Sequence, residues 1–368
     1  MRAAIIKQFV NERREVITLN VLQVLREFGF EVELVTNQKP DLDALKANMK
    51  AELPISRSKY LLPFGLGDTF VYERLMLSAF CRTLDVDLAV DVHGDLPAYA
   101  VPSRTPLVIY GFFPLPALLR PQYDWKYSNS LAWKMYLQPY KALALSSARR
   151  DRNRIRLMTL TKFSQTAIRQ EYGLDSEIVY APVDVSRYGM HWDNEDRRNN
   201  ILVLARISPE KRIENAIDLL KKVRALDAGW TLSVVGSLSP WNRRYLDQLR
   251  RLAGDLPVNF IINATPDQLE SEISTSNYYL HTMKAEHFGI SVVEAMSGGL
   301  VPIVPDFGGP AEFVPSQFQY RSLDEAARKI VGSKDELSDF RVKVHEAAQD
   351  FSEKRFRERV SSVIEKAI

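Results

Sequence analysis

The amino-acid sequence predicts an α/β protein of two domains, each a doubly wound parallel sheet with helices on both faces. Three observations support this prediction. At 368 residues the chain is longer than one ordinary hydrophobic core requires. Short apolar runs of strand type alternate with helical periodicity along most of the chain, which is typical of parallel sheets. A polar, charge-rich stretch at residues 191–200 interrupts the alternation and indicates a domain boundary.

The composition is that of an ordinary globular protein, with 46% apolar and 26% charged residues. A net charge of +3 fits anionic partners such as phosphates but does not indicate nucleic acid. The single cysteine, Cys81, excludes a disulfide within the chain and a cysteine-based metal cluster, so we expect a reducing compartment. No apolar run reaches the length of about 18 residues that a membrane-spanning helix needs. The first residues, "MRAAIIKQFV", predict a strand rather than a signal peptide, and we expect a cytoplasmic protein.

The first domain is predicted for residues 1–185 and begins with a strand at 2–9. A helix follows over 15–30, where apolar residues recur at helical spacing and Gly29 provides the stop. The remaining elements are a strand at 31–36, strand-then-loop units at 84–95 and 105–114, and a strand with its helix over 154–173.

The second domain is predicted for residues 186–348 and repeats the alternation. Strands are predicted at 199–207, 230–236, 258–263, 278–283 and 300–305, and helices at 212–226, 241–254, 265–276 and 290–296. A terminal amphipathic helix within residues 349–368 is expected to pack back on the first domain. Two doubly wound halves imply a cleft, with ligands bound at the carboxyl ends of the strands.

The segment "KAEHFGISVVEAMSGG", residues 284–299, sets Glu286 and Glu294 eight positions apart. Because the segment follows a strand, Glu286 falls in a strand-to-helix loop and Glu294 lies about one turn into the helix. The first turn of a helix leaves backbone N–H groups unpaired, and such groups bind anions. Two carboxylates beside an anion site can hold hydroxyls of a ribose and of a sugar, which indicates a nucleoside diphosphate joined to a sugar. On spacing alone, two solvated surface acids are an equally good interpretation.

Phosphate recognition is assigned to two loops of the second domain. One is the helix start at Phe288, Gly289 and Ile290, where the glycine lets a phosphate approach the backbone closely. The other is "ARISPEKR", which carries Arg206 and Lys211 after the first strand of the domain. A diphosphate leaving group needs about two charges neutralised, and paired cations supply them without metal. Such loops often carry charges for structural reasons alone, so it is the two loops together that favour a functional interpretation.

These motifs, "ARISPEKR" and "EHFGISVVEAMSGGLVPIV" with the later "FGGPAEFV", resemble glycosyltransferase family 4, whose members are retaining enzymes of the GT-B fold. The Glu-x7-Glu pattern of the family is matched by Glu286 and Glu294. The sequence is most similar to the mannosyltransferases that build dolichol-linked oligosaccharide, in particular the α-1,2-mannosyltransferase group. "VIYGFFP", "LTKFSQTAIRQEYG" and "VYAPVD" also resemble that group. The resemblance is strong from about residue 155 to 315 and patchy before that range.

The resemblance implies a role for each matched position. Arg206 and Lys211 would bind the donor diphosphate, together with the backbone amides at the helix start. Glu294 would hold the ribose hydroxyls, and Glu286 would be the catalytic carboxylate that lies against the donor sugar. The positions that would surround the nucleotide base are Val235, Gly236, Ile262 and Asn263.

The donor implied is a nucleotide-diphosphate sugar such as GDP-mannose. Family members need no metal, and no other cofactor is expected. No Asp-x-Asp lies where the cleft is predicted: "DLD" at 41–43 falls in a polar connection and "DVD" at 85–87 precedes a strand, so both are interpreted as structural.

The sequence departs from the family pattern after its first strand. Family members usually carry a glycine-rich loop there, whereas this chain has "KQFVNERREV", which contains no glycine. Arg13 and Arg14 in this stretch could meet an acceptor phosphate, or they could be solvated surface charges.

A second departure concerns the acceptor side of the reaction. Related mannosyltransferases carry a histidine in a Tyr-x-His-aromatic-Pro sequence, and here Phe112 of "YGFFP" occupies that position. A phenyl ring can neither donate a hydrogen bond nor carry a proton. His93, at the end of the preceding strand, could supply a polar group from a neighbouring loop, and Asp91 or Asp95 could orient it or act as acceptor base.

The stretch from 120 to 156 carries nine Lys or Arg, two Asp and six Tyr or Trp residues. Basic residues beside interfacial aromatics suit the surface of an anionic membrane, so a peripheral contact with the cytoplasmic membrane face is one interpretation. A helix packed on the domain with its charged face in water is the other. Nucleic acid is not favoured, since the basic charge is local and no binding motif accompanies it.

The sequence therefore predicts a retaining hexosyltransferase, with mannose as the expected sugar, that acts on a hydroxyl of a lipid-linked or soluble saccharide acceptor. We expect front-face substitution, in which a departing phosphate oxygen helps to deprotonate the incoming hydroxyl. The alternative is a nucleotide-sugar-binding GT-B protein without transfer activity, which Phe112 and the missing glycine loop favour. An epimerase or phosphorylase of the same fold is a further alternative, although no motif for the cofactor lysine of a phosphorylase is found.

Overall fold

The computed structural model describes residues 1–7, 15–40, 42, 55–63, 72–95, 101–123, 128–150, 152–333 and 336–368. The chain divides into two units, which are residues 1–182 with 353–368 (unit 1) and residues 183–352 (unit 2). The divisions therefore follow Pro182 and Ser352, a few residues away from the boundaries predicted at 185 and 348.

Unit 1 is built on a parallel sheet with the strand order β3-β2-β1-β4-β5-β6-β7 among its described residues. Its strands are β1 (Arg2–Lys7), β2 (Glu31–Gln38), β3 (Ile55–Leu62), β4 (Leu88–Gly94), β5 (Leu107–Gly111), β6 (Ile155–Thr159) and β7 (Glu177–Ile178). β1, β4 and β5 are buried along most of their length, which explains why their sequences are largely apolar. β3 is an edge strand whose mostly exposed, polar sequence contains no run that predicts a strand.

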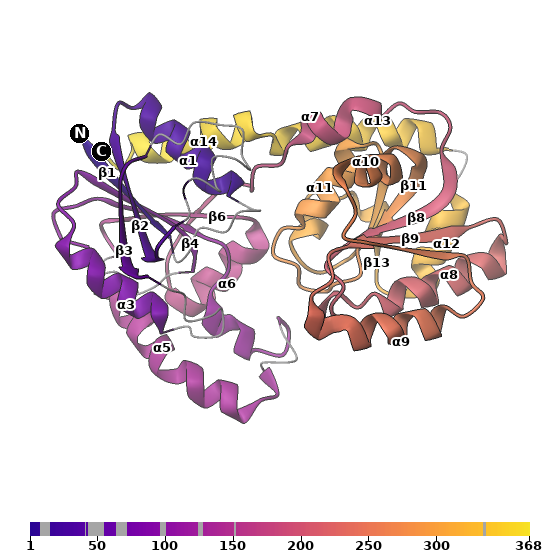
Figure 1. Cartoon of the computed structure of the whole chain (residues 1–368), viewed down its shortest axis with the longest axis horizontal. Coiled ribbons are helices and arrows are strands. Elements are labelled where there is room, and N and C mark those ends of the chain that lie inside the picture. The colour runs from indigo at the N-terminus through magenta and orange to yellow at the C-terminus, as the bar shows by residue number, and fades with distance from the viewer. Residues whose placement is uncertain are drawn as a thin grey trace. The chain divides into compact units, whose positions relative to one another are not determined.

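Helices cover both faces of the unit 1 sheet. They are α1 (Val16–Glu27), α3 (Glu73–Phe80), α5 (Leu131–Arg150), α6 (Lys162–Tyr172) and α14 (Glu353–Glu365), with short 3-10 helices at η1 (Cys81–Thr83) and η2 (Leu115–Leu119). α1 and α14 lie side by side on one face, and α3 and α5 lie on the other (Figure 1). The Phe356 ring lies 5.7 Å from the Tyr110 ring, and Arg357 donates a hydrogen bond to Asn20 Oδ1 at 2.6 Å. α14 thus packs within unit 1.

Unit 2 carries a second parallel sheet, with the strand order β10-β9-β8-β11-β12-β13. Its strands are β8 (Arg198–Leu204), β9 (Thr231–Gly236), β10 (Val258–Ile262), β11 (Ser276–Leu280), β12 (Val301–Pro305) and β13 (Gln319–Tyr320). The chain runs outward from β8 to β10 and then returns to continue from β11 in the other direction, so the strand order reverses between β8 and β11. This switch point is where open α/β sheets bind ligands. The predicted α/β class with two doubly wound sheets is confirmed.

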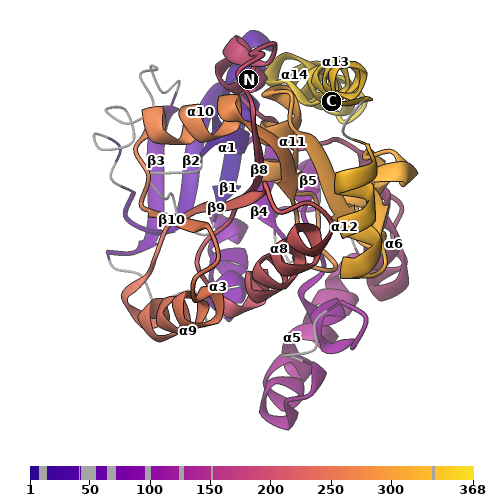
Figure 2. The same ribbon diagram turned by 90° about the vertical axis from the view of Figure 1, so that its right-hand side faces the viewer.

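The helices of unit 2 also form two layers. They are α7 (Val185–Tyr188), α8 (Glu214–Leu226), α9 (Arg243–Ala253), α10 (Pro266–Thr275), α11 (Ile290–Ser297), α12 (Leu323–Gly332) and α13 (Leu337–Ala348), with short 3-10 helices at η3 (Gly189–His191), η4 (Pro209–Lys211), η5 (Pro240–Asn242), η6 (Gly309–Glu312), η7 (Ser316–Phe318) and η9 (Gln349–Phe351). α8, α9 and α12 lie on one face of the sheet, and α10, α11 and α13 lie on the other (Figures 1 and 2).

Arg197, just before β8, ties several of these elements together. Its guanidinium donates hydrogen bonds to the carbonyls of Ile273 at 3.0 Å, Ser276 at 2.6 Å and Gly298 at 2.5 Å. These carbonyls belong to the end of α10, the start of β11 and the residue after α11. Burial lowers the pKa of Arg197 to about 9, so the side chain is still charged at neutral pH. Arg197 therefore fixes both ends of the segment that carries the candidate site.

Replacing Arg197 by methionine should destabilise unit 2 by about 2–4 kcal/mol, because several buried carbonyls lose their donor at once. Thermal and urea unfolding of the purified chain would measure this loss. Arg198→Met is the matched control, since the neighbouring Arg198 side chain is 58% exposed and should cost less than about 0.5 kcal/mol. Equal losses in the two variants would contradict the role assigned to Arg197.

Candidate functional site

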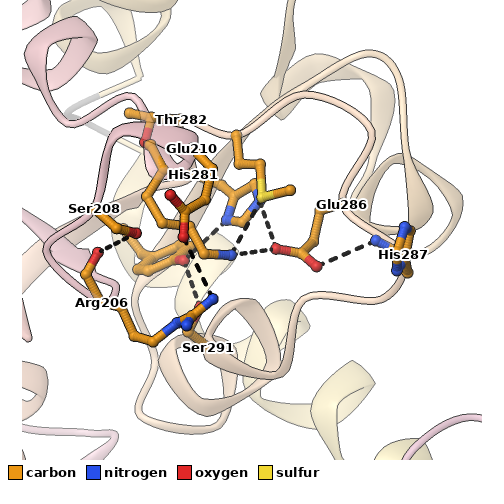
Figure 3. Close-up of polar contacts among 11 residues, drawn as sticks. Arg206, Ser208, Glu210, His281, Thr282, Glu286, His287 and Ser291 are labelled. Atoms are coloured by element: carbon orange, nitrogen blue, oxygen red, sulfur yellow. Dashed lines mark hydrogen bonds and ion pairs between the residues drawn. The ribbon is translucent and has the colours of Figure 1, made fainter. Parts of the chain in front are cut away.

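The loops that follow β8 and β11 meet at the switch point of the unit 2 sheet. Lys211 ends the η4 turn after β8, and Glu286 lies in the loop after β11. The Lys211 Nζ and the Glu286 Oε2 are 2.8 Å apart, and the two side chains are 20% and 19% exposed. Figure 3 shows the Glu286 carboxylate among the side chains of this cluster. Two of the residues predicted to bind donor thus form one nearly buried ion pair.

Both oxygens of the Glu286 carboxylate contact neighbouring groups. Its Oε1 accepts the backbone N–H of His287 at 3.2 Å, and its Oε2 faces both Lys211 and the Nε2 of His281, which is 3.8 Å away. Burial by itself raises the pKa of Glu286, but the charge and hydrogen bond of Lys211, together with the neighbouring His281 and His287, outweigh burial and lower the pKa to about 2. Glu286 is therefore an ionised carboxylate at neutral pH.

Lys211 also contacts two residues that follow β11. Its ammonium lies 3.2 Å from Met283 Sδ, and its carbonyl accepts the Thr282 hydroxyl at 2.5 Å. These contacts draw the cationic loop against the segment that directly precedes Glu286. Contacts of the ammonium and of the backbone carbonyl therefore fix the position of the Lys211 charge.

Backbone strain gathers in the same region. Among the described residues, the non-glycine residues with positive φ are Arg212 at 50°, Asn263 at 54° and Ala285 at 56°. They lie in the connections after β8, β10 and β11, respectively. L-residues reach this conformation only at a cost of order 1 kcal/mol or more, so the surrounding structure of unit 2 must impose it. Strain of this kind is common at ligand-binding sites.

Two glycines of the family motifs are required sterically. Gly289, at φ +92, stands at the N-cap of α11 in a conformation that favours glycine. Gly309 donates its N–H to the Glu286 carbonyl at 2.6 Å, and a Cβ on Gly309 would lie 2.2 Å from the His287 carbonyl oxygen. The "FGGP" segment therefore packs directly against the loop that carries Glu286 and supports it.

α11 begins where the sequence predicts, at Ile290, with its first turn beside the Glu286 loop. Its first amides lack intrahelical acceptors, as at every helix start, and offer an anion site. The Phe288 ring is buried and lies 5.6 Å from Phe313 and 5.7 Å from Phe351, measured between ring centroids. Phe288 is thus anchored in the core by its side chain and is available to a ligand only through its backbone.

Glu294 is half-buried on α11. It lies near Tyr188 of α7, where burial first and the Glu294 charge second raise the pKa of the phenol. The positions predicted to surround the base lie at the carboxyl ends of β9 and β10: the Gly236 carbonyl accepts the Asn263 N–H at 2.9 Å, and Asn263 Oδ1 accepts the Leu238 N–H at 3.2 Å. Ile262 is the last residue of β10. The positions predicted to surround the base therefore lie together at the carboxyl ends of β9 and β10, and Glu294 lies on α11.

Arg206 stands apart from the ion pair. Its side chain is 59% exposed, and its guanidinium lies 3.5 Å from Glu210 Oε1 (Figure 3). It shares the connection after β8 with Lys211 but does not join the Lys211–Glu286 contact. Its charge is accessible to an anionic ligand.

His281 is a functional candidate that the sequence analysis does not single out. It directly follows β11, and its Nδ1 lies 3.1 Å from the Tyr279 hydroxyl, which in turn lies 2.8 Å from the Ser291 hydroxyl of α11. Burial lowers the pKa of His281 to about 4, and the Lys211 charge acts in the same direction while Glu286 opposes it. The available signal was a histidine at the carboxyl end of a strand, five residues before Glu286.

In unit 1, the loops after β4 and β5 adjoin. The Phe112 ring covers Gly94, so that a Cβ on Gly94 would lie 2.5 Å from the ring, and Phe112 N donates to the Gly94 carbonyl at 2.7 Å. His93, the residue before Gly94, is half-buried and donates its backbone N–H to Asp91 Oδ1 at 2.7 Å. His93 thus lies within the end of β4, next to the glycine that Phe112 covers from the loop after β5.

Asp95 is buried within unit 1. Its carboxylate accepts the hydroxyls of Tyr140 at 2.6 Å and Tyr172 at 3.0 Å, and the Leu115 N–H at 3.3 Å. These bonds join the end of β4 to α5, α6 and η2, which gives Asp95 a structural role.

Arg13 and Arg14 lie outside the described residues, as does most of the "DLD" stretch. No group of three or more His, Cys, Asp or Glu side chains in the described part of the chain could hold a metal ion.

Residues 191–330 match the family model described as Glycosyl transferases group 1. A Dictyostelium discoideum protein named GDP-Man:Man(3)GlcNAc(2)-PP-Dol alpha-1,2-mannosyltransferase is 30% identical over 210 residues, which cover 51% of this chain and 42% of the relative. The Homo sapiens protein of the same name is 32% identical over 149 residues, covering 37% of this chain and 30% of the relative. The chain thus spans less than half the length of these curated relatives.

Solved structures with the same fold cover the whole chain. Anabaena Alr3699/HepE in complex with UDP has a TM-score of 0.70 at 15% identity, with 100% of both chains covered. A glycosyltransferase from Rickettsia africae has a TM-score of 0.67 at 11% identity, covering 100% of this chain and 98% of the other. The fold is the predicted GT-B fold. Residues 191–330 match the glycosyl transferases group 1 model, and the predicted resemblance to such enzymes is confirmed.

The buried histidine should make the stability of the protein depend on pH. Because the pKa of His281 falls from 6.5 to about 4 on folding, the unfolded chain binds a proton between these values that the folded chain does not. Stability must then decrease as the pH falls through this window, by roughly 2 kcal/mol. Urea unfolding from about pH 7 to about pH 4.5 should show a smaller decrease for His281→Gln than for the wild type. Equal decreases would contradict a buried, uncharged His281.

Proposed function

We propose that the chain is a retaining hexosyltransferase that moves a hexose, with mannose as the expected sugar, from a nucleotide-diphosphate sugar to a hydroxyl of a lipid-linked saccharide or similar glycan. The observation that carries this proposal is the Lys211–Glu286 ion pair, which lies beside the start of α11 at the switch point of the unit 2 sheet. The names of the relatives, which specify GDP-mannose and a dolichol-linked acceptor, support the choice of sugar and acceptor.

The donor would be bound entirely by unit 2. Lys211 and Arg206 would neutralise the diphosphate, in the role that a divalent cation fills in other transferases, together with the first amides of α11. Glu294 would accept hydrogen bonds from the ribose hydroxyls. The base would lie against Gly236 and Asn263, whose backbones are already joined at the ends of β9 and β10.

The reaction would break the bond between the anomeric carbon and the phosphate oxygen and form a bond to the acceptor oxygen on the same face of the sugar. The acceptor proton would pass to an oxygen of the departing diphosphate. Lys211 and Arg206 would stabilise the negative charge that develops on that leaving group. Glu286, ionised throughout, would face the hexose and stabilise positive charge near the anomeric carbon.

Unit 1 would bind the acceptor. His93 directly precedes Gly94, the residue that the Phe112 ring covers, so His93 is our candidate for the polar group that the resemblance implies at the Phe112 position. Asp95 would act indirectly, by fixing the end of β4 through Tyr140 and Tyr172. Arg13 and Arg14 remain candidates for an acceptor phosphate.

A peripheral contact with the cytoplasmic membrane face is part of the proposal, since the expected acceptor is lipid-linked. None of the helices in the described ranges is long and apolar enough to cross a membrane. α5 exposes Leu131, Met135 and Leu143 to solvent, together with the basic residues Lys134 and Arg149. Exposed apolar side chains beside cations fit the surface of an anionic bilayer.

The donor proposal predicts separate effects on binding and turnover. A thermal-shift screen of guanosine, uridine and adenosine diphosphates and their hexose conjugates should identify one base, with roughly 2.7 kcal/mol of stabilisation at 100 times the dissociation constant. Glu286→Gln should retain binding of that donor but lower the release of nucleoside diphosphate by about 100-fold or more. Glu325→Gln on α12 is the matched control. Near-normal turnover in Glu286→Gln would refute the assignment, and binding without any wild-type turnover would favour the non-catalytic alternative.

The membrane proposal predicts that the chain co-sediments with vesicles of phosphatidylcholine and phosphatidylserine and that salt weakens this binding. The double variant Leu131→Asp with Met135→Asp should lose most of it, because two exposed apolar side chains become charged. Leu226→Asp, which alters an exposed apolar residue of unit 2, should bind as the wild type does. Equal binding by the double variant would show that α5 is not the contact.

A further inference from the structure

His281 and Lys211 approach the same oxygen of Glu286. The Lys211 Nζ lies 2.8 Å from Oε2, and the His281 Nε2 lies 3.8 Å from it. The Nε2 has no hydrogen-bond partner among the described residues, although the side chain is only 6% exposed. A movement of about 1 Å would bring Nε2 within hydrogen-bond distance of the carboxylate. The imidazole is therefore a buried group poised beside Glu286.

The contacts behind the ring determine which nitrogen carries the proton. Burial raises the pKa of Tyr279 and lowers that of His281 to about 4, so at neutral pH the phenol is protonated and the imidazole is uncharged. A bare lone pair on Nε2 would face the carboxylate of Glu286, and two acceptors repel each other. The stable arrangement has the Tyr279 hydroxyl donating to Nδ1, over the 3.1 Å that separates them, and the Nε2–H directed toward Glu286.

The proposed function gives Lys211 a second partner. Without donor, its ammonium neutralises Glu286 over 2.8 Å. A bound diphosphate carries more negative charge than one carboxylate and competes for the same ammonium. When Lys211 turns toward the diphosphate, Glu286 retains only the backbone N–H of His287 among its present donors. A nearly buried carboxylate that loses a partner is destabilised unless another donor replaces it.

We propose that His281 is a positioning residue that takes over Oε2 of Glu286 through its Nε2–H when Lys211 engages the donor diphosphate. This inference rests on the proposed function. His281 transfers no proton and does not contact the donor. It holds the ionised carboxylate in the orientation that faces the hexose. The imidazole is held in turn by the Tyr279 hydroxyl, which itself contacts the hydroxyl of Ser291 on α11.

The test compares His281→Leu, which removes the N–H donor, with His281→Gln, whose side-chain amide restores one at similar reach. His281→Leu should lower kcat by roughly 10- to 100-fold, while KM for the donor changes by less than about threefold. His281→Gln should recover most of that loss. The assay is release of nucleoside diphosphate by the full chain from the nucleotide hexose that stabilises it most in the thermal-shift screen.

His345 supplies the matched controls. It lies on α13, where its ring nitrogen contacts the Ser297 carbonyl at 2.7 Å, away from the Glu286 cluster. His345→Leu and His345→Gln should therefore leave both kcat and KM unchanged. Tyr279→Phe removes only the hydroxyl that orients the ring, and it should lower kcat less than His281→Leu does. If His281→Leu does not fold, a selective fall of kcat in Tyr279→Phe, with His281→Gln still active, supports the proposal.

The outcomes separate this inference from the function on which it rests. An active wild type with an unchanged kcat in His281→Leu would overturn the inference alone. A loss that His281→Gln fails to rescue, or one in which kcat and KM change together with the melting temperature, would assign His281 a structural role and overturn the inference as well. A wild type that turns over no nucleotide sugar would overturn the proposed function and the inference with it.

Discussion

The ion pair between Lys211 and Glu286 is the interaction on which the rest of the candidate site depends. It joins the loops after β8 and β11, the two strands between which the order of the unit 2 sheet reverses. Both charges are largely removed from solvent, so each requires the other for as long as no ligand is present. This requirement accounts for the tight support around them: Gly309 packs against the Glu286 loop, and Ala285 is held at positive φ just before the carboxylate.

The same constraint connects the resting site to catalysis. An anion that binds at the start of α11 must compete with Glu286 for Lys211. Binding of the donor therefore releases the Glu286 carboxylate from Lys211. His281 lies where it can receive the carboxylate, and Tyr279 links it to the first turn of α11. Arg206, exposed beside Glu210, adds a charge that does not have to leave a buried partner. The site is therefore electrostatically balanced both without a donor and, on this account, with one.

The sequence predicted most of the fold because burial imposes a pattern on the chain. β1, β4 and β8 are apolar runs, and α11 begins at the predicted Ile290 after a glycine. β3 escaped prediction because an exposed edge strand needs no apolar run. For the site, loop positions identified Lys211 and Glu286 separately, but nothing in a spacing of 75 residues shows that they pair. His281 was hidden in "YYLHTM", where it reads as part of a strand, and the two tyrosines that bind Asp95 lie in distant helices.

Competition between Glu286 and a donor diphosphate for Lys211 can be measured by calorimetric titration with the bare nucleoside diphosphate. Replacing Glu286 by glutamine removes the competing charge but leaves in place the groups that are proposed to bind the diphosphate. Glu286→Gln should bind the nucleoside diphosphate more tightly than the wild type does, by roughly three- to tenfold. Unchanged or weaker binding by this variant would show that Glu286 does not compete with the diphosphate for Lys211.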